Sequence, residues 1–222
     1  MPSIADSIVI VFARAPRAGA AKTRLMPRLG AEGAARLQKR LIQAALRTAA
    51  GSGDVQLHVT RSHAWFRTLG VPVRMQRGAD LGARMHHALR VAVRRHRAVV
   101  LIGNDAPSLR TTDLDQAVRW LRGGADIVLA PAEDGGYALI GARRIDARVF
   151  HGVRWGGPDV LAQTLRNAER CGLECRLLRT VWDVDRPEDL ERLRALRFSS
   201  ASRRGARRSR RSRGHSDGSG RT

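Results

Sequence analysis

Short apolar runs alternate with longer segments of helical periodicity along most of this chain, and this alternation restricts the possible folds more than any other feature. Strands are expected at 7–13, 54–60, 71–76, 98–104, 126–132 and 137–142, with one more inside 173–184. Helices are expected at 31–50, 81–96, 112–123, 158–172 and 186–198. Repeated strand–helix units of this kind predict an α/β protein with three layers, in which helices cover both faces of a mostly parallel central sheet.

The C-terminal end of the chain has a different composition. From Ser199 onward it contains eight arginines and one aspartate among Ser and Gly, with almost nothing apolar to bury. Such a segment is expected to be disordered. We therefore predict one domain over residues 1–198 and a disordered basic tail over 199–222. The tail holds seven of the 21 net positive charges, and the other 14 are spread over the domain.

Several classes of protein are disfavoured by the same sequence. No apolar run approaches the roughly 20 residues that a membrane-spanning helix needs. The first residues include Asp6 and no basic region, so a signal peptide is not expected. The two cysteines, Cys171 and Cys175, have neither the spacing of a zinc or redox site nor the number of a disulfide framework. A cytoplasmic protein without a membrane span is expected.

A loop rich in basic and small residues follows the first strand, with the sequence ARAPRAGAAKTRLMPRLG over 13–30. Its cations are suited to phosphate groups: they are Arg14, Arg17, Lys22 and Arg24. Ala13 and Gly19 allow a ligand to approach the backbone closely. The loop lacks the glycine spacing of both the Walker loop and the dinucleotide-binding loop.

Lysine is rare in this chain. Only Lys22 and Lys39 are present, against 39 arginines. A compact ammonium group on a flexible stem differs from a planar guanidinium in the ligands it suits. The use of a lysine in the basic loop favours a specific requirement at position 22, and a solvated basic loop without a ligand is the alternative.

Asp105 lies directly after the strand expected at 98–104, within GNDAP. In α/β sheets, ligands bind beyond the carboxyl ends of the strands. A single carboxylate beside a phosphate loop suits Mg²⁺, which prefers one or two carboxylates together with water and phosphate oxygens. Asp105 could equally organise the turn that leads into Pro107.

Further candidates follow the later strands. Asp134-Gly135-Gly136 predicts a hairpin turn that a ligand could still pass over, and Tyr137 comes directly after it. Asp183, at the end of the last expected strand, is the candidate for a second metal ligand. Asp185 is expected to cap the following helix.

Two glycine-containing segments precede helices. Gly78 lies in QRGADLGARM, at a turn from strand to helix. Trp155 stands before two glycines and a helix N-terminus, where it could form a wall for a substrate or belong to the core.

Six motifs occur in a familiar order: KTRL, QRGADLGARM, GNDAPSL, PAEDGGYALIG, VRWGGPDVLAQT and DVDRPEDL. Over about residues 7–195 the chain resembles the DUF2064 family, which is similar to the nucleotide-diphospho-sugar transferases of the GT-A fold. More distantly, it resembles the guanylyltransferases of molybdenum-cofactor and 2-phospholactate metabolism. The sequence departs from the family at Asn104, where a small hydroxyl residue is usual, and at Gly156-Gly157, where Ser-Thr is usual.

The resemblance implies a transferase that depends on Mg²⁺ or Mn²⁺ and acts on a nucleotide-diphosphate sugar and a small acceptor. One alternative is a nucleotidyltransferase of the guanylyltransferase type. A second alternative is a non-catalytic protein on the same fold that binds anions or nucleic acid, with the basic tail contributing nonspecific anion binding.

The resemblance also assigns roles to residues. Lys22, Arg24 and Asp105 would be catalytic, and Asp105 and Asp183 would bind the metal. The residues expected to bind the nucleotide are Ala13, Arg14, Arg17, Gly19, Lys22, Arg24, Gly78 and Asn104. The residues expected on the substrate side are Asp134, Gly135, Gly136, Tyr137 and Trp155. The whole assignment requires the Lys22 amine and the Asp105 carboxylate to face one cleft.

Overall fold

The structure is a computed structural model that describes residues 5–196. The chain divides into two compact units, one ending at Asp185 and the other beginning at Arg186. In the second unit, residues 189–196 form a helix, inside the range expected for the last helix. The expected domain end at 198 and the basic tail over 199–222 lie outside the described residues. The elements below all belong to the first unit.

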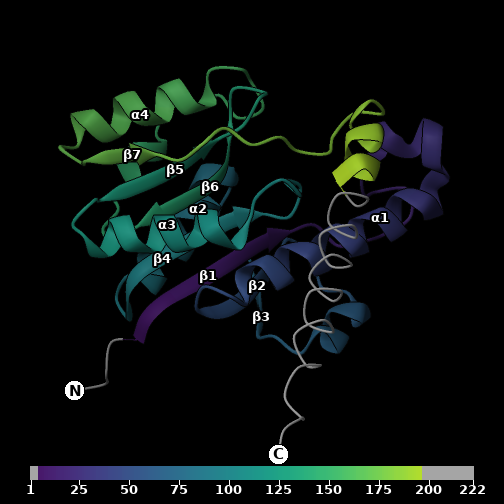
Figure 1. Ribbon diagram of the computed structural model, residues 1–222, viewed down its shortest axis with the longest axis horizontal. Helices are drawn as coiled ribbons and strands as arrows, with labels where there is room; N and C mark the ends of the chain where they lie inside the picture. Colours follow the sequence, from purple (N-terminus) through teal and green to yellow (C-terminus); the bar gives the residue numbers. More distant parts are fainter. Residues whose placement is uncertain (1–4, 197–222) are drawn as a thin grey trace, which may run out of the picture. The chain divides into compact units, whose positions relative to one another are not determined.

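A seven-stranded sheet forms the centre of the first unit, with the order β3-β2-β1-β4-β6-β5-β7, which can be followed in Figure 1. The strands are β1 (Ala5–Ala13), β2 (Asp54–Val59), β3 (Val73–Met75), β4 (His96–Gly103), β5 (Ile127–Pro131), β6 (Tyr137–Ala142) and β7 (Cys175–Leu177). Strand β6 is antiparallel to both β4 and β5, while the other strand pairs are parallel. The predicted α/β fold with a mostly parallel sheet is therefore confirmed.

Helices cover both faces of this sheet. They are α1 (Met26–Ala49), α2 (Leu81–Ala92), α3 (Thr111–Arg122) and α4 (Val160–Arg170), with short 3₁₀ helices at Thr23–Leu25, Ala64–Leu69 and Ala147–Phe150. Helices α1 and α3 pack on one face, where Ile42 and Leu114 belong to one core cluster. Helices α2 and α4 pack on the other face, where Leu89 and Ala168 belong to a second cluster. This arrangement confirms the three layers.

Two helix boundaries of the first unit differ from the expectation by more than two residues, and the ends of α3 and α4 differ by one or two. Helix α1 begins at Met26 instead of residue 31 and has a break at Gly30, which adopts a φ of 67°. Helix α2 ends at Ala92 instead of residue 96, because His96 already pairs with Ala5 at the start of β1. Sheet pairing thus takes precedence over the helical pattern of the sequence at that point.

The expected hairpin after β5 is present. Strands β5 and β6 pair as antiparallel neighbours, and the Gly136 amide donates a hydrogen bond to Asp134 Oδ1 at 2.9 Å inside the turn. The carboxylate thereby closes the turn that Asp134-Gly135-Gly136 predicted, and Asp134 itself remains exposed.

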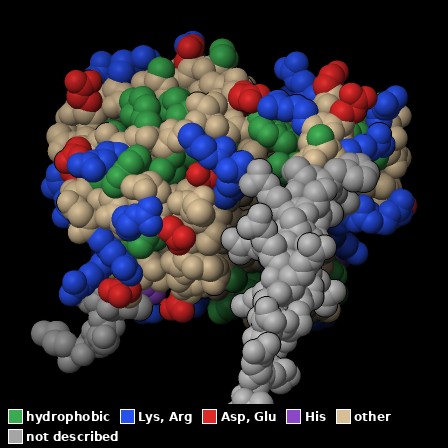
Figure 2. Space-filling model, in the orientation of Figure 1, with side chains coloured by type: hydrophobic (Ala, Val, Ile, Leu, Met, Phe, Trp, Pro, Cys, Tyr) green, Lys and Arg blue, Asp and Glu red, His purple; other side chains and the backbone are tan. Residues whose placement is uncertain are grey.

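Basic side chains are spread over the face shown in Figure 2, with acidic side chains between them. This distribution agrees with the net positive charge that the sequence assigns to residues before the tail. No helix in residues 5–196 has both the length and the apolar character needed to cross a membrane.

A histidine is buried within the sheet face that α2 adjoins. His58 on β2 is 9% exposed, its ring stacks on Phe12 with centroids 5.9 Å apart, and its Nε2 lies 3.1 Å from Gln56 Oε1. Burial, followed by the positive charges of Arg74 and His87, lowers the pKa of His58 to about 4. The folded protein therefore holds this imidazole in its neutral form at neutral pH.

We expect His58 to make the fold sensitive to acid. Below the unfolded-state pKa of about 6.5, the unfolded chain binds a proton that the folded chain excludes until the pH nears 4. The free energy of unfolding should therefore fall as the pH decreases through this window, by about 3 kcal/mol in total. Urea titrations at several pH values should show this loss in the wild type and a smaller one in His58→Phe. Arg74→Gln should raise the pKa of His58 in the folded protein and so reduce the loss of stability at low pH. Equal pH dependence of stability in all three proteins would contradict the argument.

Candidate functional site

Two loops meet where β1 and β4 end. The strands are parallel neighbours, with Phe12 paired to Gly103, so the residues that follow them emerge at the same edge of the sheet. The basic loop follows Ala13, and Asn104-Asp105 follows Gly103. Topology thus brings together two segments that are about 80 residues apart, at the edge where ligands bind in such sheets.

Lys22 has the most distinctive conformation in this region. It is the one described non-glycine residue with a positive φ, of 50°. Its side chain is 7% exposed, its Nζ lies 2.8 Å from Asp105 Oδ1, and it donates a hydrogen bond to the Val184 carbonyl at 2.6 Å. Strained backbone of this kind is typical of functional sites. The Lys22 amine and the Asp105 carboxylate therefore face one another, as the sequence analysis required.

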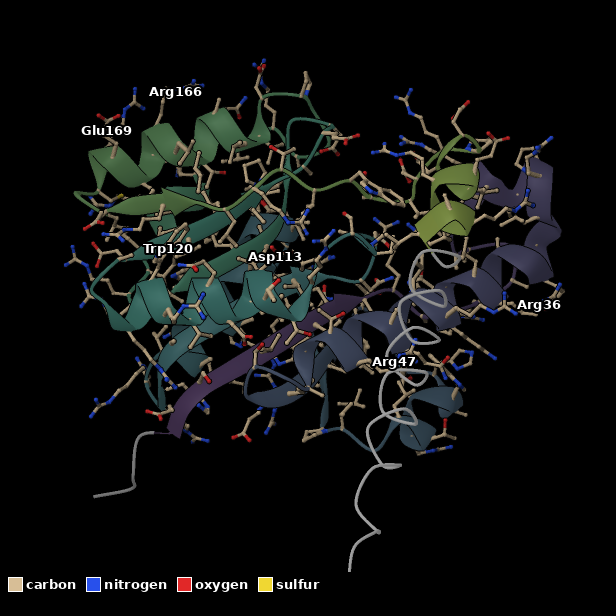
Figure 3. The ribbon with its side chains drawn as sticks, in the orientation of Figure 1. Arg36, Arg47, Asp113, Trp120, Arg166 and Glu169 are labelled. Atoms are coloured by element: carbon tan, nitrogen blue, oxygen red, sulfur yellow. The ribbon has the colours of Figure 1, made fainter. Side chains whose placement is uncertain are left out.

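The segment that carries Val184 is anchored beside Asp105. Arg179 donates hydrogen bonds to Asp113 on α3 and to the Ser108 carbonyl, at 2.6 Å in each case; Asp113 is labelled in Figure 3. The Val184 amide donates to the Asp105 carbonyl at 2.8 Å. These contacts fix the end of the first unit against the loop after β4.

A cavity of about 360 Å³ opens beside these groups. Its lining combines the basic loop, helix α1, the loop after β4 and the end of the first unit: Arg14, Ala20, Ala21, Lys22, Thr23, Arg24, Gln38, Asn104, Asp105 and Asp185. The guanidinium of Arg24 pairs with the carboxylate of Asp185 at its rim. Five sequence-predicted residues therefore line one cavity: Arg14, Lys22, Arg24, Asn104 and Asp105.

Asp183 lies two residues before Asp185 of the cavity lining, and two other carboxylates affect its pKa. Burial raises the pKa of Asp183, and the negative charges of Asp134 and Asp105 raise it further. Among the described residues there is no group of three or more His, Cys, Asp or Glu side chains arranged to hold a metal ion. Asp105 and Asp183 are thus close enough to interact electrostatically, without forming a complete set of ligands by themselves.

The residues expected on the substrate side are divided by the structure. Asp134 is exposed, and Gly135 and Gly136 are half-buried in the hairpin turn. The hydroxyl of Tyr137 is buried, and burial raises its pKa, so this group is not presented to a ligand. Trp155 packs against Phe150, with ring centroids 6.3 Å apart, and is partly buried on the core that α2 and α4 share.

The remaining predicted nucleotide-binding residues lie outside the lining of the cavity. Ala13 is buried at the end of β1, whereas Arg17 and Gly19 are exposed on the basic loop. Gly78 lies against the start of α2, where its carbonyl accepts a hydrogen bond from Arg84 Nε at 3.1 Å.

Five lining residues were not among the predicted site residues: Ala20, Ala21, Thr23, Gln38 and Asp185. Of these, Gln38 and Asp185 form contacts with other residues of the site. Gln38 is a buried polar residue in the apolar face of α1, and this exception to the helical pattern was the available signal. Asp185 was expected to cap a helix, and its pairing with Arg24 connects positions 161 residues apart, which no local pattern reveals.

The chain has the fold of the nucleotidyltransferase and nucleotide-diphospho-sugar transferase class. A protein of Desulfovibrio desulfuricans G20 assigned as a nucleotide-diphospho-sugar transferase is 34% identical, over 82% of this chain and 83% of that chain, with a TM-score of 0.77. The family described as an uncharacterized protein conserved in bacteria, DUF2064, matches residues 41–157. The chain belongs to this family.

The chain is also similar, over about half of its length, to a relative whose reaction is named. The 3-phospho-D-glycerate guanylyltransferase of Phenylobacterium zucineum is 36% identical over 123 residues, which are 53% of this chain and 54% of that protein. The chain thus spans about half the length of this curated relative.

Two other solved structures share the fold. CMP:2-keto-3-deoxy-manno-octonic acid synthetase, solved with CTP, is 14% identical over 88% of this chain and 99% of that chain, with a TM-score of 0.55. Rv0371c of Mycobacterium tuberculosis, solved with manganese, is 20% identical over 86% and 98%, with a TM-score of 0.50.

Proposed function

We propose that the protein is a nucleotidyltransferase that joins a nucleoside monophosphate to a small phosphorylated acceptor. The observation that carries this proposal is the buried amine of Lys22, held 2.8 Å from Asp105 at the wall of a cavity rimmed by Arg14 and Arg24. The similarity to a guanylyltransferase that uses 3-phospho-D-glycerate supports GTP as the first donor and a phosphorylated acid as the first acceptor to test.

The reaction requires little covalent chemistry from the protein. An oxygen of the acceptor phosphate forms a bond to the α-phosphorus of the nucleotide, and the bond from that phosphorus to the oxygen bridging to the β-phosphorus breaks. Pyrophosphate leaves with that oxygen, and the ionised acceptor has no proton to lose. Catalysis then depends on positioning and on cations that offset charge developing on the phosphates.

In this proposal the cavity residues supply those cations. Lys22 would leave its contact with Asp105 and place its amine against the β- and γ-phosphates of the nucleotide. Arg24 and Arg14 would neutralise the outer phosphate oxygens. A compact ammonium can exchange partners in a space where a bulky guanidinium would collide, which accounts for the use of lysine at position 22.

A divalent cation fits the acidic side of the cavity. Burial raises the pKa of Asp183, and the negative charges of Asp134 and Asp105 raise it further, so these carboxylates are near enough to interact. Hard oxygen ligands of this kind suit Mg²⁺ or Mn²⁺, and Asp105 and Asp183 are the residues that would hold the ion. When bound, the ion would polarise phosphate oxygens and help to orient the triphosphate. The acceptor would lie toward Asp134, Gly135, Gly136 and Trp155.

Glycosyl transfer from a nucleotide-diphosphate sugar was favoured by the family resemblance. The same cavity could hold such a donor, but the similarity to a guanylyltransferase and the fold shared with a CTP-bound synthetase support nucleotidyl transfer better. The two reactions release different products: nucleotidyl transfer releases pyrophosphate, and glycosyl transfer releases a nucleoside diphosphate.

The experiment compares these products directly. Purified protein with Mg²⁺ is incubated with GTP and 3-phospho-D-glycerate, and in parallel with GDP- and UDP-sugars and the same acceptor. We expect pyrophosphate release that depends on both GTP and acceptor, with a guanylylated product detected by mass spectrometry. Release of nucleoside diphosphate from a sugar nucleotide, without pyrophosphate from GTP, would favour glycosyl transfer instead. Reactions without acceptor are the control for simple hydrolysis.

A further inference from the structure

Gln38 occupies an unusual position for a polar residue. It lies on α1 between Ala35 and Leu41, which belong to the buried face of the helix, and it is only 3% exposed. Burying a carboxamide is unfavourable unless its polar atoms form hydrogen bonds. Its contacts therefore need a specific explanation.

The amide nitrogen of Gln38 makes two of these contacts. Nε2 donates to the Arg14 carbonyl at 3.2 Å and to Asn104 Oδ1 at 3.4 Å. Asn104, which is 5% exposed, in turn donates from Nδ2 to Asp105 Oδ1 at 2.9 Å. A chain of hydrogen bonds thus runs from the basic loop through α1 to the carboxylate that faces Lys22.

One backbone group determines which atoms donate and which accept in this series of hydrogen bonds. The Arg14 carbonyl can only accept, so Gln38 must turn its NH₂ group toward it, and the second N–H of that group faces Asn104. Asn104 must then present its carbonyl to Gln38 and its NH₂ group to Asp105. Both carboxamides are oriented by this donor and acceptor pattern, with no freedom to flip independently.

The consequence for Asp105 is that its two oxygens become different. Oδ1 accepts from Asn104 Nδ2 and lies 2.8 Å from Lys22 Nζ. Oδ2 makes no hydrogen bond within the described residues, and the side chain is 47% exposed in the cavity. Oδ2 is therefore the oxygen available to a ligand from outside.

We propose that Gln38 is a positioning residue, which acts through Asn104 to hold Asp105 with Oδ2 toward the cavity. This inference rests on the proposed function, because the role of Oδ2 is to meet the cation that accompanies the nucleotide. Gln38 lines the cavity but is only 3% exposed, and the proposed role requires no contact between Gln38 and either of them. Residues that orient a metal ligand in this way change metal affinity by about 10- to 100-fold when they are replaced.

Two substitutions of similar size separate this role from simple packing. Gln38→Met keeps the volume and removes both donors, and we expect it to weaken the binding of GTP in the presence of Mg²⁺ about tenfold. Gln38→Glu replaces the donor by an acceptor, so Asn104 should turn its NH₂ group toward Glu and its carbonyl toward Asp105. We therefore expect Gln38→Glu to weaken binding more than Gln38→Met does.

The matched control is Arg36→Met. Arg36 lies two residues away on the same helix and is exposed, and its label in Figure 3 marks a side chain directed away from the sheet. Calorimetric titration with GTP and Mg²⁺ should give wild-type affinity for this variant. Melting temperatures of all variants, measured without ligand, show whether each one folds.

Asn104→Ala provides the test that a packing role would not pass. Without the Asn104 side chain, the hydrogen bonds no longer connect Gln38 to Asp105. Gln38→Met should therefore cause little further loss of affinity in that background. Equal losses in both backgrounds would overturn the proposal. The ligand-free protein gives a second measurement: the side-chain NH₂ signals of Gln38 and Asn104 should resist hydrogen exchange in ¹H–¹⁵N spectra, and the Asn104 signal should lose this protection in Gln38→Met.

The outcomes keep the two hypotheses distinct. If the wild type binds GTP and Gln38→Met binds it equally well, the positioning role is wrong and the proposed function stands. If the wild type binds no nucleotide with Mg²⁺ or Mn²⁺, the proposed function fails. In that case rapid exchange of both NH₂ groups would also overturn the hydrogen-bonded chain, and slow exchange would leave it as a structural feature without the proposed role.

Discussion

Replacing Lys22 with methionine should reduce kcat/KM for pyrophosphate release about 10²- to 10³-fold. The amine is 7% exposed and lies at the wall of the candidate cavity, so its charge acts where water screens it little. Removal of one such group that stabilises charge in a transition state typically has an effect of this size. The fold should survive, because Asp105 is 47% exposed and can be hydrated once its partner is gone.

Lys39→Met is the matched control, since it removes the only other lysine of the chain. Lys39 lies on α1, where its Nζ is 5.5 Å from the centroid of the Trp65 ring, and it does not line the cavity. Its loss should leave kcat/KM within about twofold. Lys22→Arg adds a second test: the larger guanidinium should restore less than a tenth of the activity. Wild-type kcat/KM in Lys22→Met would exclude the amine from the reaction.

Replacing Gly135 with alanine should destabilise the fold by about 4 kcal/mol, with a fall in Tm of about 10 °C. Gly135 has a φ of +86°, and an added Cβ would lie 1.9 Å from the carbonyl oxygen of Pro158. The Leu161 amide also donates to the Gly135 carbonyl at 2.9 Å, so the turn and the start of α4 are held together. The new methyl group can be accommodated only if that backbone contact separates.

Gly156→Ala separates the strain of the left-handed backbone from the steric clash with Pro158. Gly156 has nearly the same φ, of +83°, but an added Cβ would meet no atom within 4 Å. It should therefore show only the strain of a left-handed conformation, about 1 kcal/mol or about 3 °C in Tm. Thermal unfolding followed by circular dichroism measures both. Equal losses of stability would mean that the loop before α4 can move away from the added methyl group without further loss of stability. The Pro158 contact would then not restrain the turn.

Much of the fold could be predicted because the central strands β1, β4, β5 and β6 are apolar runs and β2 alternates apolar and polar residues. The first two residues of β1 and of β4 carried no such signal, so the sequence did not predict that these strands begin at Ala5 and His96. Those residues are in the sheet because they pair with one another, and the pairing is a contact between distant segments. The same reason explains the early end of α2, whose helical pattern continues past Ala92.

The candidate site was predictable only in part. Lys22 and Asp105 were found because a rare lysine and a carboxylate after a buried strand stand out locally. The contact of Lys22 with the Val184 carbonyl was not predictable, because it joins a side chain to a backbone group 162 residues away. Tyr137 stood out as the only tyrosine, but the sequence could not show that its hydroxyl turns into the core.

We expect the cavity between the basic loop and Asp105 to receive the triphosphate together with its cation. A crystal structure of the protein grown with Mn²⁺ and a GTP analogue, in which an imido group bridges the α- and β-phosphates, would show where the nucleotide binds. We predict triphosphate density within hydrogen-bonding distance of Lys22 Nζ and Arg24, with an anomalous manganese peak beside Asp105 Oδ2. A fully occupied nucleotide bound elsewhere, with Lys22 still paired to Asp105, would contradict this account.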